Sequence, residues 1–378
     1  MNFLLRIISF LLSFIFISSY ADAAEIRIGV AEALTGPAAK YGAPIKNGFI
    51  LAAEEINKTG GINGNTIKLI IEDEQGKKEE AINVFKKFIF KDKVLAIFGP
   101  TLSNSAFAAD HVANAAKTVV FGTSNTAEGI TAIGPYVFRN SIAEADIIPK
   151  VISITKKKLG LRKVAVIYGN DDAFTKSGYD VFKKALGAEK LQVVATETFA
   201  KGDIDFSAQL TKIKSLKPEA IICSALVEEA ANIILQARKL GLPQDIHFIG
   251  GNGFNSSKLS EIAGKAVEGA ISGSPWFLDD PNKKNKTFVK AYKKKFSSVP
   301  DQFAAQAYDA LYIMAEGIKK VKLTGDINKD RNALRDALAK VKGFSGVGGR
   351  FSFNEKRDAE QKGRVLVVKN GKFTLFAE

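Results

Sequence analysis

Short β-branched runs alternate with longer amphipathic stretches along most of this chain, and this alternation limits the folds open to it. Strands that alternate with helices predict parallel sheets built from βαβ units. The pattern runs twice, once before about Arg139 and once after about Lys163, which predicts two doubly wound α/β lobes. The strand-like runs are "IRIGVAEAL", "IKLIIEDE", "VLAIFG", "TVVFGT", "KVAVIYG", "LQVVATETF", "AIICSA" and "IHFIG", and the helical stretches are 46–57, 79–90, 105–116, 145–159, 176–186, 206–216 and 228–240.

The C-terminal third follows a different pattern. Helical stretches are predicted at 283–296, 304–321 and 330–341, and we expect them to pack back onto the lobes. A strand pair, "GRFSF" and "RVLVVKNGKFTLF", follows, and Asn370-Gly371 is a strong hairpin-turn signal. No flexible linker is evident, so short ordered crossovers should join the lobes.

The first 23 residues predict a secretory signal peptide. Arg6 precedes an apolar run at 7–17, and Ala21 to Ala23 form a small-x-small cleavage site. The apolar run is too short to span a bilayer comfortably, so we expect cleavage after Ala23 and a soluble exported product. An uncleaved N-terminal anchor is the alternative. No cysteine stands at the cleavage site, so a lipid-anchored form is not indicated.

Charge and cysteine content narrow the class of partner. The net charge is +14, but the lysines spread along presumed helix faces without interleaved aromatic residues. We therefore expect a solvated surface that favours anionic ligands, and no nucleic-acid partner. Cys223 is the only cysteine, which excludes intramolecular disulfides, and its apolar flanks predict an inert strand thiol.

Sequence signals of the common enzyme classes are missing. His111 and His247 are the only histidines, and no HExxH, GxSxG, Walker A or GxGxxG pattern occurs. The acidic run 72–74 at a strand end is typical of a solvated turn, and "GVGGRF" is not followed by a helix. We expect no enzymatic activity, no metal and no cofactor.

Hydroxyl and amide residues follow two of the predicted strands. Gly99 is followed by Thr101 and residues 103–105, and Gly122 is followed by residues 123–125. Ligands of open α/β sheets lie beyond the carboxyl ends of strands, where a helix N-terminus also offers free N–H groups. The pattern is compatible with a carboxylate site; simple helix capping by Ser103 and Ser124 is an equally good interpretation of these residues alone.

Two further motifs, "LTGPAAKYG" (34–42) and "INKTGGING" (56–64), are specific signals of one family. With them and with supporting segments such as "IFGPTLSNSA" and "FIGGNGFNSSKL", the mature chain resembles the periplasmic solute-binding proteins of the branched-chain amino-acid (leucine-isoleucine-valine) transport family over essentially its whole length. The resemblance implies a type I periplasmic binding protein fold, with two lobes joined by three crossovers. It also implies a periplasmic monomer that delivers its ligand to an ABC permease in the inner membrane.

The lobe boundaries expected from this resemblance are 24–140 plus 276–349 for the first lobe and 141–275 plus 350–378 for the second. Position by position, the resemblance places Ser103 and Ser124 at carboxylate contacts and the Thr123 carbonyl towards the ligand ammonium. It places Tyr41, Phe174 and Trp276 as aromatic walls of the cleft.

One position departs from the family pattern. Amino-acid binders of the family carry a glutamate that pairs with the ligand ammonium, and this sequence has Asn252 there. An asparagine accepts only through a neutral carbonyl, and a buried ammonium without a counter-charge is costly. Glu228 or Asp172 could substitute for the missing acid. Leu226 also stands where amino-acid binders tend to have a tyrosine.

These observations predict the substrate-binding component of an ABC importer for a small amphipathic carboxylate. A branched-chain or related amino acid is the default ligand. Desamino acids, aromatic or keto acids among them, are the alternative because of Asn252. A ligand-sensing module coupled to a receptor is the alternative from another functional class.

Overall fold

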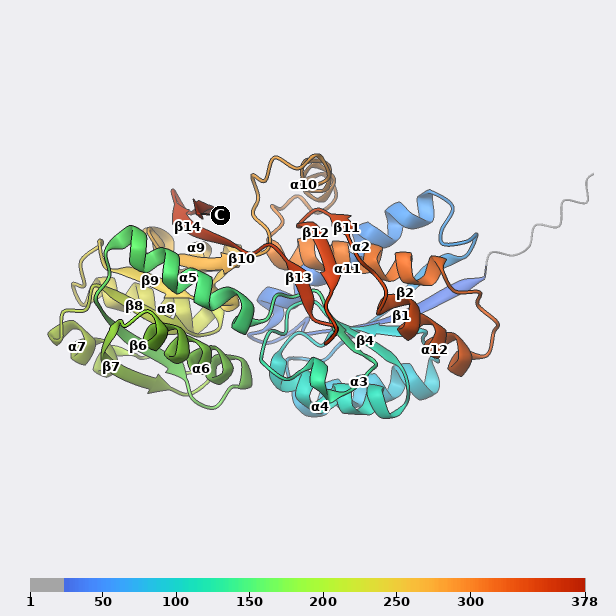
Figure 1. Cartoon of the computed structure of the whole chain (residues 1–378), viewed down its shortest axis with the longest axis horizontal. Coiled ribbons are helices and arrows are strands. Elements are labelled where there is room, and N and C mark those ends of the chain that lie inside the picture. Colours follow the sequence, from blue (N-terminus) through green and yellow to red (C-terminus); the bar gives the residue numbers. More distant parts are fainter. Residues whose placement is uncertain (1–23, 378) are drawn as a thin grey trace, which may run out of the picture.

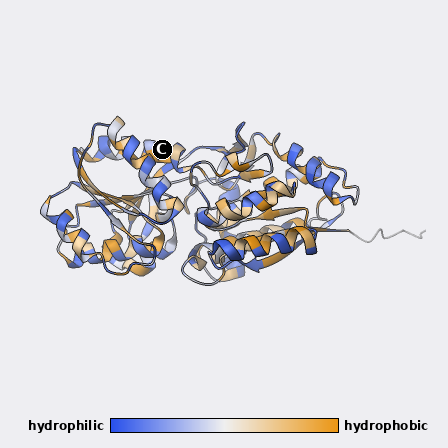
Figure 2. Cartoon of the chain, turned by 90° about the horizontal axis from the view of Figure 1, so that it is seen from below, coloured by the Kyte–Doolittle hydropathy of each residue, from blue (hydrophilic) through white to orange (hydrophobic). Residues whose placement is uncertain are grey.

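The computed structural model describes residues 24–377, which form two lobes side by side along the long axis of the molecule (Figure 1). Each lobe is built on one β-sheet with helices packed on its faces. Apolar residues are concentrated on the strands and on the inner helix faces (Figure 2). The signal peptide expected at 1–23 lies outside the described residues. Within 24–377, no helix is both long enough and apolar enough to cross a membrane.

The first lobe contains a parallel five-stranded sheet in the order β2-β1-β3-β4-β5. All four strands predicted for this half are present, and β5 is a short additional edge strand. The elements are β1 (Glu25–Glu32), α2 (Ala39–Lys58), β2 (Thr66–Asp73), α3 (Lys78–Lys86) with a π-helical extension η1 (Lys87–Lys91), β3 (Ala96–Phe98), α4 (Ser103–Ala115), β4 (Val119–Gly122), η2 (Thr131–Ile133) and β5 (Val137–Arg139).

Helix α2 begins seven residues before the predicted start at residue 46, in spite of Gly42 and Pro44. Gly42 is required there, because a Cβ at this position would lie 1.9 Å from the carbonyl oxygen of Ala33. The close approach of α2 to the end of β1 places Lys40 and Tyr41 in the first turns of the helix, at the edge that faces the second lobe.

The second lobe contains a seven-stranded sheet in the order β15-β14-β10-β9-β8-β6-β7. Strands β6 to β10 are parallel, and β14 is antiparallel to β10 and β15. The elements are α5 (Glu144–Leu159), β6 (Lys163–Gly169), α6 (Ala173–Ala188), β7 (Gln192–Phe199), α7 (Ser207–Ser215), β8 (Ala220–Ser224), α8 (Val227–Lys239), β9 (His247–Gly250), η3 (Asn252–Phe254), α9 (Ser257–Ala263), η4 (Gly264–Val267), β10 (Ile271–Ser274), β14 (Arg364–Lys369) and β15 (Lys372–Ala377). Cys223 lies buried in β8, and burial raises the pKa of its thiol.

The three C-terminal helices are α10 (Lys283–Phe296), α11 (Gln302–Lys319) and α12 (Ile327–Leu338), and α11 packs along α2 of the first lobe as expected. The two helices approach closely at Gly48, where a Cβ would lie 2.3 Å from the carbonyl oxygen of Ala304. The hydroxyls of Tyr308 and Tyr312 both donate to Glu55 of α2.

A small antiparallel sheet, β11 (Phe344–Gly346), β12 (Gly349–Phe353) and β13 (Ala359–Gln361), corrects one strand assignment. The sequence paired "GRFSF" with the last strands, but β12 pairs with β11 and β13 instead. The β14–β15 hairpin turns at Asn370-Gly371 as predicted, with positive φ at both residues. The expected boundary put residues 350 onward in the second lobe, yet Phe353 packs on Phe121 and Phe138 of the first sheet.

The chain crosses between the lobes three times, at 140–143, 275–282 and 362–363. Two ion pairs, each between a buried and a half-buried side chain, hold these segments together. Arg139 pairs with Asp358, and Arg364 pairs with Asp280 at 2.7 Å and also donates to the carbonyl of Pro275. The second pair joins the start of β14 to the second crossover, so it fixes two of the three crossings relative to each other.

We expect Arg364→Ala to lower the free energy of unfolding by about 3 kcal/mol, because it leaves the buried Asp280 carboxylate without its partner. Urea unfolding at neutral pH measures this. Arg350→Ala removes an exposed arginine of β12 and serves as the matched control, with little change expected. Equal stability of the two variants would contradict a structural role for the Arg364–Asp280 pair.

Candidate ligand-binding cleft

A small cavity of about 20 Å³ lies between the lobes, and we call it the cleft cavity. The structure brings five of the eight predicted site residues together in its wall. A volume this small holds about one water molecule, so the lobes must separate or the side chains must shift to admit a larger ligand. The lining residues are Tyr41, Thr101, Leu102, Ser103, Ser124, Phe174, Leu226, Asn252, Gly253 and Phe303.

The first-lobe wall is formed where β3 and β4 end. After β3 the chain turns at Gly99, whose φ is +105° and whose added Cβ would meet the Ala31 carbonyl oxygen at 2.0 Å. The turn directs Thr101 and Leu102 into the wall, and α4 begins at Ser103 without a side-chain cap. Because first-turn N–H groups have no intrahelical partner, this wall presents donors and the positive end of the helix dipole.

The two predicted serines have different hydrogen bonds. The Ser103 hydroxyl accepts from the backbone N–H of Ala127 at 3.3 Å, which leaves its own proton free. The Ser124 hydroxyl donates to the Thr101 carbonyl at 2.7 Å and would have to turn to donate elsewhere. Ser103 is therefore the donor already available to an anion in this wall.

Two buried carboxyl groups, those of Glu32 and Glu74, lie directly behind this wall. The sequence predicted a solvated acidic turn at 72–74, and this prediction is wrong for Glu74. Glu74 accepts from the Ser105 hydroxyl at 3.2 Å and from the Thr101 N–H at 3.4 Å, while Glu32 accepts from the Thr101 hydroxyl. Burial raises the pKa of Glu74 to about 7 and that of Glu32 well above its ordinary value. Both carboxyls position the β3–α4 turn.

The second-lobe wall contains Asn252, whose polar atoms are already engaged. Its backbone N–H donates to Glu144 at 2.8 Å, its side-chain NH₂ donates to the Ser124 carbonyl at 3.3 Å, and its side-chain carbonyl accepts from Gln302. Burial raises the pKa of Glu144 to about 7. Asn252 thus joins the lobes, and its side-chain carbonyl already accepts one hydrogen bond from Gln302.

The remaining predicted residues lie outside the cavity wall. Thr123 is buried beside it, whereas Trp276 packs edge-on against Phe288 and donates its indole N–H to Asn285 at 2.6 Å. Glu228 forms an ion pair with Lys40 across the lobe interface.

Asp172, the second acid considered as a substitute, is also engaged. It caps α6 and accepts from Asn104 of the other lobe at 2.7 Å. Among the described residues, no acidic side chain lines the cleft cavity.

Sequence reasoning missed Phe303 as a wall residue. It lies on α11, and its ring packs edge-on against Tyr41 at a centroid distance of 4.9 Å. No local pattern marks it, because it reaches the cavity only through the packing of α11 on α2. Thr101 was in the hydroxyl-rich stretch after β3, and its position at the strand end was the available signal.

Polar contacts across the cleft hold the lobes against each other. The Tyr41 hydroxyl accepts from the Val227 N–H at 2.6 Å and donates to the Gly253 carbonyl at 3.1 Å. Burial raises the pKa of this hydroxyl, so it stays a neutral donor. The Ala173 N–H adds a further contact by donating to the side-chain carbonyl of Asn104 at 2.9 Å.

Two α/β lobes that close over a cavity between the carboxyl ends of their strands define a ligand-binding protein of the two-lobed class. Residues 25–372 match the model of the periplasmic binding protein family, and the chain belongs to this family. It is a family of solute-binding proteins rather than enzymes, as the sequence led us to expect.

Similar proteins cover nearly the whole chain. A leucine-, isoleucine-, valine-, threonine- and alanine-binding protein of Pseudomonas aeruginosa is 29% identical over 362 residues, which cover 95% of this chain and 91% of that protein. The solved structure of LivJ from Streptococcus pneumoniae with isoleucine has a TM-score of 0.86 at 30% identity, covering 92% of this chain and 97% of the other. The structure of a solute-binding protein of R. palustris with benzoate has a TM-score of 0.85 at 26% identity, covering 94% of this chain and 96% of the other.

We expect Glu74→Gln to change how stability depends on pH. The folded protein keeps the Glu74 proton to about pH 7 and the unfolded chain loses it near 4.5, so wild-type stability falls as the pH rises between these values. Glutamine does not ionise, so the variant does not lose stability in this way. Between pH 4 and pH 8 its free energy of unfolding should therefore rise, relative to that of wild type, by on the order of 3 kcal/mol.

Urea unfolding of both proteins at pH 4 and pH 8 measures this difference. Glu79→Gln, an exposed position on α3, is the control and should parallel wild type. An identical pH dependence of Glu74→Gln and wild type would show that Glu74 ionises as freely in the folded protein as in the unfolded chain.

Proposed function

We propose that this protein is the substrate-binding component of an ABC importer and that it binds a small carboxylate with an apolar body and no α-ammonium group. The uncharged cleft cavity carries this proposal, because its wall offers donors for an anion but, within the described chain, no acid for a cation. We further propose export to the periplasm through a cleaved signal peptide and delivery of the ligand, by a monomer, to a permease in the inner membrane.

The carboxylate would bind at the first-lobe wall. The uncapped first turn of α4 and the free proton of Ser103 both favour negative charge at this point. Ser124 would add a second donor once its hydroxyl turns from the Thr101 carbonyl. Charge-assisted hydrogen bonds of this kind contribute about 1.5–3 kcal/mol each.

The apolar body of the ligand would contact side chains from both lobes. Tyr41 and Phe303 come from the first lobe, and Phe174 and Leu226 come from the second. Aromatic and aliphatic walls with few polar groups suit an aromatic ring or a branched alkyl chain. Closing the lobes on such a body buries it from both sides.

An α-ammonium would be poorly matched in this cavity. Closure removes water, and a buried cation without a counter-charge costs several kcal/mol. Asn252 has its carbonyl engaged by Gln302, and Glu228 and Asp172 are held by Lys40 and Asn104. The benzoate complex of the R. palustris protein, which has the same fold, supports a desamino ligand.

Branched-chain amino acids are the second candidate, favoured by the amino-acid ligands of the Pseudomonas aeruginosa protein and of LivJ. An amino acid would require Glu228 or Asp172 to exchange its present partner for the ligand ammonium. The two candidates therefore differ in whether an existing inter-lobe contact must be broken.

Calorimetry on mature protein, refolded to remove bound ligand, tests the proposal. Benzoate and 4-methylpentanoate are titrated beside phenylalanine and leucine. Binding of the desamino acids at least tenfold tighter than the amino acids is the expected result. Tighter binding of leucine would favour the second candidate, and no binding of any of the four would contradict both.

We expect Ser103→Ala to weaken binding of the preferred carboxylate about tenfold, because it removes the available hydroxyl donor. Ser215→Ala, at the exposed end of α7, is the matched control and should bind as wild type does. Unchanged affinity of Ser103→Ala in the same calorimeter would remove Ser103 from the carboxylate site.

We expect Asn252→Asp to weaken binding of a desamino carboxylate tenfold or more. The substitution keeps the shape of the side chain but adds a negative charge beside the cavity, and buried like charges repel. Raised affinity for benzoate in Asn252→Asp would contradict the proposed orientation of the ligand.

A further inference from the structure

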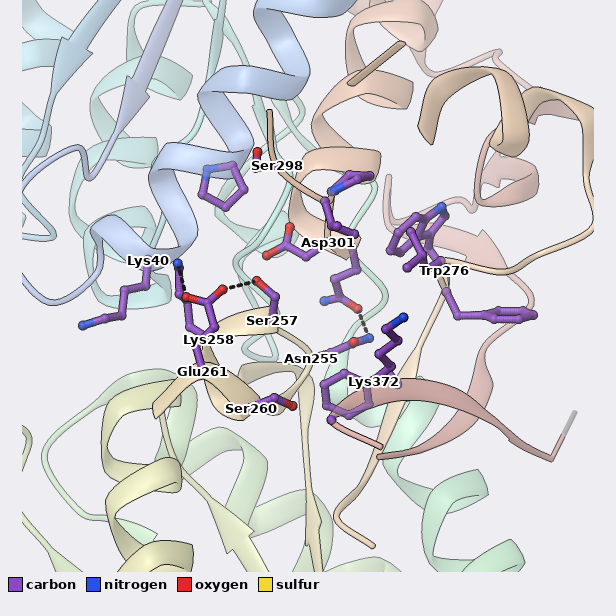
Figure 3. Close-up of a pocket in the computed structure, with 18 of the residues that line it drawn as sticks. Lys40, Asn255, Ser257, Lys258, Ser260, Glu261, Trp276, Ser298, Asp301 and Lys372 are labelled. Carbon is purple, nitrogen blue, oxygen red and sulfur yellow. Dashed lines mark hydrogen bonds and ion pairs between the residues drawn. The ribbon is translucent and has the colours of Figure 1, made fainter. Parts of the chain in front are cut away.

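A second, much larger cavity of about 1100 Å³ opens between the lobes (Figure 3), and we call it the side groove. Its first-lobe wall comes from the first turns of α2, from the C-terminal half of α10 and from the loop 298–302. Its second-lobe wall comes from α9 and from the β14–β15 turn at 370–373, and the crossover residues 276–278 close one side. Its volume is ample for an organic molecule larger than benzoate.

The floor of the side groove is apolar. Trp276 and Phe277 are buried in it, and Leu278 and Phe373 are partly buried beside them. Val299 on the loop before α11 is 49% exposed, which is high for a valine. Leu278, Val299 and Phe373 therefore offer most of the apolar surface that a ligand in the groove would remove from water.

Exposed lysines from three different elements stand around this floor. Lys265, Lys293 and Lys372 have no ion-pair partner within residues 24–377. Figure 3 shows Lys372 and Trp276 on the same side of the groove. Because the three lysines are exposed and unpaired, they are available to an anion.

The acidic residues of the groove are already engaged. Glu261 pairs with Lys258, Glu268 accepts from the backbone N–H groups of Asn370 and Gly371, and Asp301 caps α11. Within the described residues, only Glu261 has a cationic partner, and Glu268 and Asp301 keep their carboxylates. The three unpaired lysines still outnumber these two carboxylates, so the side groove keeps a net positive charge.

We propose that the side groove is a second binding site that takes a free amphipathic organic anion. The apolar body lies on Leu278, Val299 and Phe373, next to Trp276, and the anionic head group contacts Lys265, Lys293 and Lys372. This site is separate from the cleft cavity and does not depend on the identity of the ligand there.

The position of the side groove couples it to closure of the cleft. Gln302, in the groove wall, accepts from Asn255 at 2.6 Å and from Ser274 at 2.7 Å, and it donates to Asn252 in the wall of the cleft cavity. The groove walls come from both lobes, so the width of the groove changes when the lobes move relative to each other. An anion that binds best at one width therefore stabilises the corresponding arrangement of the lobes. Coupling of this kind is reciprocal between the two sites.

The test uses Trp276, the only tryptophan of the chain, as the reporter. Ligand-stripped mature protein is titrated with 12-bromododecanoate below its micelle-forming concentration, because bromine quenches tryptophan on contact. We expect saturable quenching with 1:1 stoichiometry. The Lys265→Ala/Lys372→Ala variant should raise the dissociation constant about tenfold.

The matched control is Lys91→Ala/Lys239→Ala, which removes the same charge from exposed positions outside the groove and should bind as wild type does. Thermal unfolding checks that both variants are folded. Linear quenching without saturation, or equal affinity of both variants, would overturn the proposal. Quenching by vesicles of brominated phosphatidylglycerol in place of the free anion would also overturn it, since the occupant would then be a membrane surface.

Discussion

In both lobes the parallel strands end at the sheet edge that faces the other lobe, because each βαβ unit returns the chain to the same side before the next strand. The turns after β3 and β4 meet those after β6, β8 and β9 across one cavity. Helix α4 starts there with uncapped amides. The wall residues that follow these strands come from segments far apart in sequence, and this topology brings them together.

Closure of the lobes depends on neutral hydrogen bonds rather than on charge inside the cavity. Tyr41 bonds to two backbone groups of the second lobe, and Asn252 bonds to the first lobe through Ser124. The Lys40–Glu228 ion pair lies outside the cavity wall. Since the charges are kept at the periphery, the interior suits a ligand with one charged group and an apolar remainder.

Much of this arrangement could be predicted from the sequence, because periodicity and strand-end residues act locally. The principal strands, the helices and the serines of the first-lobe wall are of this kind. Trp276 was predicted as an aromatic wall by the family resemblance, and Glu228 as a substitute for the missing acid. Phe288 and Asn285 hold Trp276 away from the cavity, and Lys40 holds Glu228.

Features decided by tertiary packing could not be predicted in this way. The partners of β12, the burial of Glu74 and the position of Phe303 in the cavity wall all depend on contacts between distant segments.

The central claim, a carboxylate on the β3–β4 edge with its apolar body between the lobes, is tested most directly by a crystal structure of the mature protein with benzoate. The account predicts the carboxylate within hydrogen-bond distance of Ser103 and the ring between Tyr41 and Phe174. A carboxylate turned towards Asn252, with the ring on the serines, would contradict it.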